Sequence, residues 1–308
     1  MRHIITILAA VLCITAASAQ VITQLGKESM NIPRGIKPDK KVSTGSVGTI
    51  QITHMDTTGA YFACIDSAQV YIDCHEWPTA QQFLRRAIAV DPHNPNNSLL
   101  LSNIATMQRF EGRYDEAVKN YSMALDLTPN AVTVLLNRAA LYITIDSTAL
   151  AQADFERVCQ LDPTNTEARY SLGMLEVERQ NFKQAEKYFE RIKAINPNSG
   201  LASEGMANLY KANGNYSKAA QCFTDVIKAR PNASLLANRA DCYLMLKQLN
   251  NAEEDIRNAL TMTPDDPYLY VLRAKLNKFR FERQDMERDI NLAVSHGLDR
   301  NLVDNLLK

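Results

Sequence analysis

The sequence predicts an all-α fold in which helical hairpins stack one on the next as an α-solenoid, and two periodic patterns support this. A small residue recurs every 33 to 37 positions, at Ala68, Ala105, Ala139, Gly173, Ala207, Ala240 and Ala274. Twelve residues after each of the first six lies a second alanine, and twelve further lies a proline: Ala80 and Pro92, Ala117 and Pro129, Ala151 and Pro163, Ala185 and Pro197, Ala219 and Pro231, Ala252 and Pro264. Because a fixed period of this length is typical of proteins built from stacked repeats, we expect about seven units.

Each unit is predicted to contain two amphipathic helices. In the third unit Leu135, Ala139 and Tyr142 fall on one helical face, and Ala151 begins the apolar face of the next helix. The small residues let the two helices approach closely. The proline lacks an N–H group, so it ends the second helix and turns the chain into the next unit.

The second and fifth units resemble the tetratricopeptide repeat. Gly112-Arg113-Tyr114-Asp115-Glu116-Ala117 matches the second half of that family's pattern, and Asn213-Gly214-Asn215-Tyr216-Ser217-Lys218-Ala219 is nearly as close. The resemblance covers residues 61–298, as repeats 61–94, 98–131, 132–165, 166–199, 200–232, 233–266 and 267–298, with 299–308 as a C-terminal capping helix. It implies a right-handed superhelix that binds a protein or peptide on a concave face formed by the first helices.

The first nineteen residues are predicted to be a secretory signal peptide. A basic start is followed by an apolar run over residues 4–16, and the small residues Ala17-Ser18-Ala19 suit signal peptidase. We expect export by the Sec route to the periplasm or beyond, with an uncleaved anchor as the alternative and no membrane span after cleavage. Leu12 precedes Cys13 where a lipid-attachment motif needs a small residue, so lipidation is not expected. Residues 20–60 are predicted to be a linker, with a possible short strand over 47–55.

The charge balance disfavours a nucleic-acid partner. Lysine and arginine total 34, as do aspartate and glutamate, so no net field attracts DNA, RNA or an anionic membrane.

No catalytic, metal or cofactor motif emerges, so we expect a non-enzyme without a small-molecule substrate. His75-Glu76 begins like a zinc-protease motif, but Thr79 stands at the second histidine position and Pro78 interrupts the helix. An exported enzyme using His75, Glu76 and cysteine thiols is the alternative from another class. Five cysteines remain after signal removal: Cys64, Cys74, Cys159, Cys222 and Cys242. Most are expected to be core residues, and a Cys222–Cys242 disulfide stays open.

Three Arg–Asp pairs recur at a separation of sixteen residues: Arg138 with Asp154, Arg239 with Asp255, and Arg273 with Asp289. Each separation runs from the first helix of a unit to its second. We interpret them as ion pairs within hairpins, with a repeated ligand-binding charge as the alternative.

The resemblance identifies residues of the first helices as candidates for partner binding: Tyr170, Met174, Glu204, Asn208, Lys211, Asn238, Asp241, Tyr268 and Lys275. Asn208 and Asn238 match the asparagines of the family's carboxylate clamp, but Glu204 replaces its first lysine, and Tyr268 and Leu272 replace later basic residues. An anionic C-terminus there would meet uncompensated negative charge, so we reject that clamp. The two asparagines are expected either to bond a partner's backbone or to be solvated surface groups.

These observations predict a scaffold that holds a partner protein of unknown identity. A structural spacer without a peptide ligand is the remaining alternative.

Overall fold

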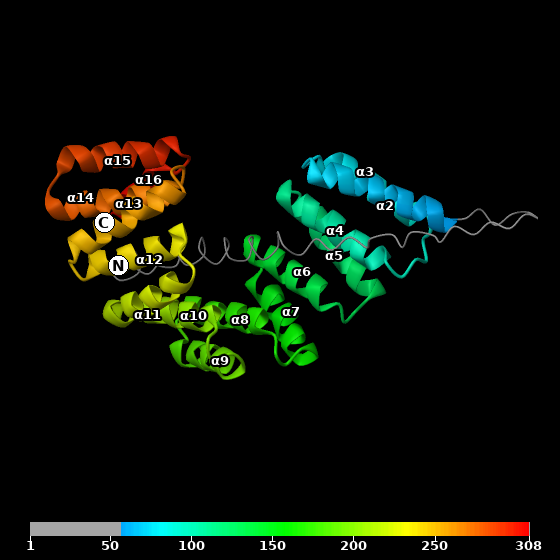
Figure 1. The fold of residues 1–308 in the computed structure, drawn as a ribbon, viewed down its shortest axis with the longest axis horizontal. Helices are drawn as coiled ribbons and strands as arrows, with labels where there is room; N and C mark the ends of the chain where they lie inside the picture. The colour runs from blue at the N-terminus through cyan, green and yellow to red at the C-terminus, as the bar shows by residue number, and fades with distance from the viewer. Residues whose placement is uncertain (1–56, 308) are drawn as a thin grey trace, which may run out of the picture. The chain divides into compact units, whose positions relative to one another are not determined.

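The computed structural model describes residues 57–307, which form fifteen helices and no strand within that range. The described residues fall into two compact units, 57–162 and 163–307. Successive helices pair into antiparallel hairpins in each (Figure 1). The predicted all-α solenoid of stacked hairpins is confirmed.

Unit 57–162 contains three hairpins: α2 (Thr57–Asp73) with α3 (Trp77–Val90), α4 (Asn97–Phe110) with α5 (Tyr114–Leu127), and α6 (Val132–Thr144) with α7 (Thr148–Leu161). The second helix of one hairpin packs on the first helix of the next, as α3 does on α4 and α5 on α6. The first helices α4 and α6 also contact each other.

Unit 163–307 contains four hairpins and one terminal helix: α8 (Thr166–Glu178) with α9 (Phe182–Ile195), α10 (Gly200–Ala212) with α11 (Tyr216–Ala229), α12 (Ala233–Met245) with α13 (Leu249–Met262), α14 (Pro267–Arg280) with α15 (Arg283–Ser295), and α16 (Arg300–Leu306). The side chains of Asn165, Asn215, Asn232, Asp266 and Asp299 accept hydrogen bonds from first-turn N–H groups, which marks where five of these helices begin.

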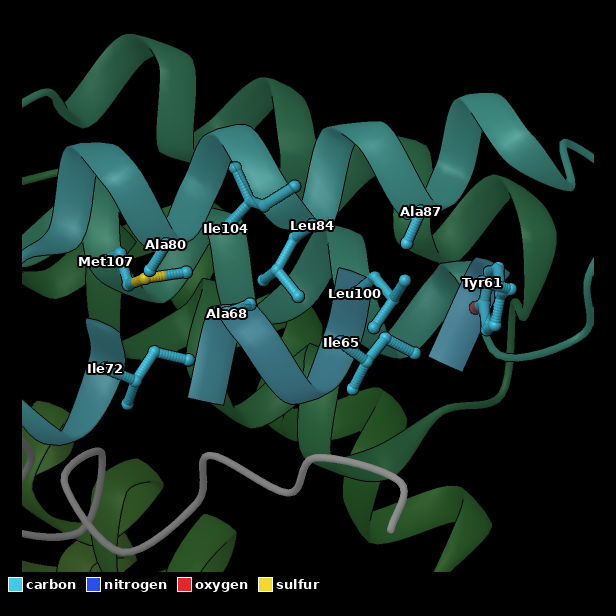
Figure 2. Close-up of a cluster of buried hydrophobic side chains, with 10 residues drawn as sticks. All are labelled: Tyr61, Ile65, Ala68, Ile72, Ala80, Leu84, Ala87, Leu100, Ile104 and Met107. Carbon is cyan, nitrogen blue, oxygen red and sulfur yellow. The ribbon is translucent and has the colours of Figure 1, made fainter. Parts of the chain in front are cut away.

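The small residues that recur in every repeat lie where helices pack against each other. Ala68, Ala105 and the other alanines of the set through Ala274 are fully buried, as are the second alanines, and Gly173 is buried. Figure 2 shows the pattern in the first hairpin, where Leu84 of α3 lies at the centre of side chains from α2 and α4. Each hairpin thus completes its core with the first helix of the next.

In the fourth repeat the recurring small residue must be glycine rather than alanine. A Cβ atom added at Gly173 would lie 2.5 Å from Cε1 of Phe189, and one added at Gly205 would lie 2.4 Å from the same ring. Phe189 is fully buried between these two glycines. The ring therefore occupies the space that a methyl group would need on either side.

Every hairpin turn contains a residue with a positive φ. It lies seven residues after the small residue in the first helix of each hairpin: His75, Gly112, Asp146, Gln180, Gly214, Lys247 and Phe281. In the second hairpin Gly112 N–H donates to the carbonyl of Arg109 and Arg113 N–H to that of Gln108. This is the Schellman arrangement, which ends a helix on a left-handed residue. Only two of the seven turns use glycine, so the other five carry backbone strain.

Helix α2 begins at Thr57, four residues before the predicted start of the first repeat at residue 61. Tyr61 in its first turns is buried, and its hydroxyl donates to Asn97 of α4 at 3.1 Å. At the other end, Val303, Leu306 and Leu307 pack on α14 and α15 as part of a core. The predicted signal peptide and the strand over 47–55 lie outside the described residues. Among residues 57–307 no helix combines the length and apolar character required to cross a bilayer.

Candidate functional site

One polar cluster joins α8, α10 and the residue that ends α11. The carboxylate of Glu204 accepts hydrogen bonds from the Tyr170 hydroxyl at 3.3 Å and from the Arg230 guanidinium at 2.5 Å. Glu204 and Tyr170 are buried, whereas half of the Arg230 side chain is exposed. Burial raises the pKa of Glu204, with the charge of Arg230 acting against it. The cluster links the first helices α8 and α10 through hydrogen bonds between side chains of the protein.

A second cluster joins α10, α12 and α14. The Lys211 ammonium donates to Oδ1 of Asn238 at 2.9 Å and pairs with Oδ2 of Asp241, also at 2.9 Å. Lys275 approaches the other oxygen of Asp241 at 3.4 Å. Burial alone would raise the pKa of Asp241, but the ammonium groups of Lys211 and Lys275 outweigh it and hold that pKa well below its ordinary value.

Most of the nine residues predicted as partner-binding candidates have little exposed surface. Six of them are buried: Tyr170, Met174, Glu204, Asn208, Lys211 and Asn238. Asp241, Tyr268 and Lys275 are half-buried. The physical reason is that the recurring small residues bring neighbouring first helices close enough for their side chains to meet, as Asn208 Nδ2 meets Met174 Sδ at 4.0 Å. Neither clamp asparagine is a solvated surface group.

The structure brings each of the three Arg–Asp pairs together across its own hairpin. Arg138 donates two bonds of 2.8 Å to Asp154, and Arg239 donates bonds of 2.8 and 2.7 Å to Asp255. Arg273 makes the same bidentate contact with Asp289, with bonds of 3.0 Å to Oδ2 and 2.6 Å to Oδ1. All three aspartates are buried, and each pair joins the two helices of one hairpin.

The pairs also extend beyond the hairpin, through residues that the sequence pattern had not identified. Arg138 donates to the hydroxyl of Ser122 on α5 at 3.1 Å, and Arg239 donates to that of Thr224 on α11 at 2.9 Å. A hydroxyl residue fifteen or sixteen positions before the arginine is the signal that could have revealed them. Each of these arginines therefore bonds to both its own hairpin and the preceding one.

A pocket of about 700 Å³ opens between α9, α10 and α11. Its apolar lining includes Phe189, Pro197, Met206 and Tyr210, and its polar lining includes Glu190, Lys193, Asp225 and the Cys222 thiol. Burial raises the pKa of Cys222, which keeps the thiol protonated and unreactive at neutral pH. The volume and the mixture of apolar walls with a few polar groups are typical of ligand pockets in proteins. No pattern in the sequence predicted this pocket, because it forms between three helices that belong to two successive repeats.

The residues considered for catalysis, His75, Glu76 and the five cysteines, all lie within the described range. His75 is the left-handed turn residue of the first hairpin, and its ring lies against Trp77 with centroids 5.0 Å apart. Cys222 and Cys242 are both free thiols, so the disulfide between them is not formed. Within residues 57–307 no three histidine, cysteine or acidic side chains gather as metal ligands do.

Comparison with known proteins finds tetratricopeptide repeats along most of this range. Profiles described as tetratricopeptide repeat match residues 146–209 and 205–267, and a profile described as TPR repeat matches residues 109–144. The crystal structure of a tetratricopeptide repeat protein from Parabacteroides merdae is similar with a TM-score of 0.71 and 32% identity, over 81% of this chain and 98% of that one.

Two further proteins share less with this chain. The crystal structure of the APC/C hetero-tetramer Cut9–Hcn1 matches with a TM-score of 0.61 and 12% identity, over 83% of this chain and 56% of that one, which shows a shared fold. Hsp70-Hsp90 organizing protein 3 of Arabidopsis thaliana is 34% identical over 75 residues, which are 24% of this chain and 13% of that protein.

Proposed function

Because the chain belongs to the tetratricopeptide repeat family, whose repeats generally form scaffolds for protein–protein interaction, we propose that it is an exported scaffold that holds a partner protein in the bacterial envelope. The observation that carries this proposal is the pocket between α9, α10 and α11. Its apolar walls are suited to an apolar side chain of a partner, and its charged rim is suited to the polar backbone around that side chain.

The pocket offers a partner an accessible surface, whereas six of the nine predicted partner-binding candidates are buried. Ser203 is an exposed residue of the pocket lining, and Cys222 and Met206 are half-buried in it. A partner segment can therefore reach this surface without disturbing the clusters around Glu204 and Asp241.

Site-specific photocrosslinking tests this proposal. The crosslinking amino acid p-benzoyl-phenylalanine is placed at Ser203 in one variant and at Ser217 in the other, since both serines are exposed but only Ser203 lines the pocket. We expect a discrete crosslinked protein from an envelope extract of the source bacterium with the Ser203 variant and not with the Ser217 variant. Equal or absent crosslinking in the two variants would instead favour a spacer without a ligand in this pocket.

Export is tested separately. We expect the chain produced in a bacterium to appear outside the cytoplasm with Gln20 as its first residue and without a lipid adduct, as read by mass spectrometry. A product that starts at Met1 and stays in the membrane fraction would support the uncleaved anchor.

A further inference from the structure

Arg109 on α4 is a buried arginine whose guanidinium has no hydrogen-bond acceptor within residues 57–307. The residue is 5% exposed, and Nε and both terminal nitrogens are buried without a partner. Its Cζ lies 5.3 Å from the ring centre of Phe110, so an aromatic ring lies near the group but supplies no acceptor. A guanidinium keeps its charge in proteins, and a buried charge without a partner is strongly destabilising. No acidic side chain of the described residues forms an ion pair with this guanidinium.

The repeat pattern supplies two references for this position. Arg109, Lys211 and Lys278 each lie four residues after the first small residue of their repeats. Lys211 donates to Asn238 and pairs with Asp241, both on α12. Lys278 donates to the backbone carbonyl of Leu307 at 2.5 Å. Both lysines thus meet oxygen acceptors in the segment that follows their hairpin.

The repeat pattern identifies the positions in the third repeat that correspond to the acceptors of Lys211. Asn238 and Asp241 lie two residues before and one residue after Ala240; the equivalents around Ala139 are Asn137 and Ala140. The asparagine is therefore the same in both repeats, whereas a buried alanine replaces the aspartate. The third and sixth repeats differ here by one carboxylate.

We infer that Arg109 binds a carboxylate of the partner polypeptide, in the place that Asp241 occupies in the later repeat. A carboxylate is favoured because the planar guanidinium fork bonds it in bidentate fashion, as Arg239 does with Asp255. Because the guanidinium is buried, a carboxylate reaches it only if the surrounding side chains or the Arg109 side chain move. Long arginine side chains readily extend toward a surface. The inference rests on the proposed function, since the carboxylate comes from the protein that the scaffold holds.

The first test introduces a carboxylate into the protein itself by substitution. Ala140→Asp places an acid where Asp241 stands in the later repeat, and Ala140→Asn is its uncharged control. We expect Ala140→Asp to raise the Tm by about 3 °C, roughly the shift for one modest ion pair in a domain of this size. The Ala140→Asn control should show no gain, and in an Arg109→Met background Ala140→Asp should lower the Tm. An equal loss of Tm from Ala140→Asp with and without Arg109 would overturn the inference.

The second test uses peptides and reads Arg109 directly. Three short peptides are titrated into the full mature chain: one capped at both ends with a central aspartate, one capped with asparagine instead, and one with asparagine and a free C-terminal carboxylate. The arginine Nε–H NMR signals are followed, and the Arg109 signal is identified by its loss in Arg109→Lys. We expect a saturable shift of that signal with the first or third peptide, which tells a side-chain carboxylate from a terminal one, and no shift with the second. If neither the first nor the third peptide shifts the Arg109 signal, the inference is overturned.

Partner capture separates this inference from the proposed function. If Arg109→Met retains the Ser203 crosslink at unchanged yield and affinity, the scaffold function stands and the role of Arg109 fails. If the wild-type chain forms no crosslink, the proposed function fails, while the Ala140→Asp stability test still decides whether Arg109 faces a vacant carboxylate position.

Discussion

Replacing Asp241 with asparagine tests the cluster between α10, α12 and α14, because it removes a charge and keeps the side-chain shape. The carboxylate lies 2.9 Å from Lys211 and 3.4 Å from Lys275, and the Lys211 side chain is 3% exposed. After the substitution a buried ammonium faces a neutral amide. Removing one partner of a buried pair costs about 3–5 kcal/mol. Asn238 still accepts from Lys211, so we expect the lower end, about 3 kcal/mol.

The assay is urea denaturation at neutral pH, followed by far-UV circular dichroism. Lys275→Met is the matched control, since 26% of the Lys275 side chain is exposed and its loss should cost less than about 1 kcal/mol. The double variant Lys211→Met with Asp241→Leu removes both buried charges and should unfold within about 1 kcal/mol of wild type. A cost below about 1 kcal/mol for Asp241→Asn, or simple additivity with Lys211→Met, would refute the reasoning.

The same cluster predicts a pH dependence. The lysines depress the folded-state pKa of Asp241, so its contribution to stability is complete above the pKa of an unfolded aspartate, about 4, and is lost as the pH falls toward the folded value. We therefore expect the difference in unfolding free energy between wild type and Asp241→Asn to shrink as the pH is lowered below about 4. A difference that stays constant over that range contradicts this.

Three further substitutions follow from other features. Phe281 is 93% exposed at φ 63°, so Phe281→Gly should stabilise by roughly 1 kcal/mol in urea denaturation, whereas Phe281→Ala should not, because alanine keeps the left-handed strain. Gly173→Ala should destabilise by about 1–3 kcal/mol despite alanine's helix propensity, because Phe189 fills the space; adding Phe189→Leu should recover part of the loss, and no recovery would argue against the clash. Arg239→Lys should cost about 1–2 kcal/mol through loss of the bidentate bonds to Asp255, and thermal unfolding indistinguishable from wild type would count against that role.

Much of the fold is predictable from sequence because the constraint is periodic. Ala105 and its equivalents are small for one reason, close helix contact, and that reason repeats along the chain. The Arg–Asp partners were predictable for the same reason, since a fixed offset inside a repeated hairpin is a fixed distance in space.

The binding surface was less predictable, because exposure depends on what neighbouring repeats place opposite a residue. Glu204 has the position of a groove residue, yet Arg230, which lies beyond the next helix, bonds and covers it. The pocket around Met206 arises from three helices of two repeats, and no single unit contains its pattern. Phe281 gives no sign of a left-handed turn in its own identity; only comparison with Gly112 and Gly214 at the same offset would reveal it.

Helix α16 has a consequence for how these molecules behave in solution. A stack of similar hairpins ends in a surface resembling the one that each internal hairpin presents to its successor. Val303 and Leu306 cover that surface on α14 and α15. If α16 were missing, the last hairpin of one molecule would expose an apolar surface to which the first hairpin of another could bind. A heterologous contact of that kind does not close into a ring unless its rotation permits it, so it can extend into a chain. Removing the seven-residue helix α16 is therefore expected to favour end-to-end association through the last hairpin.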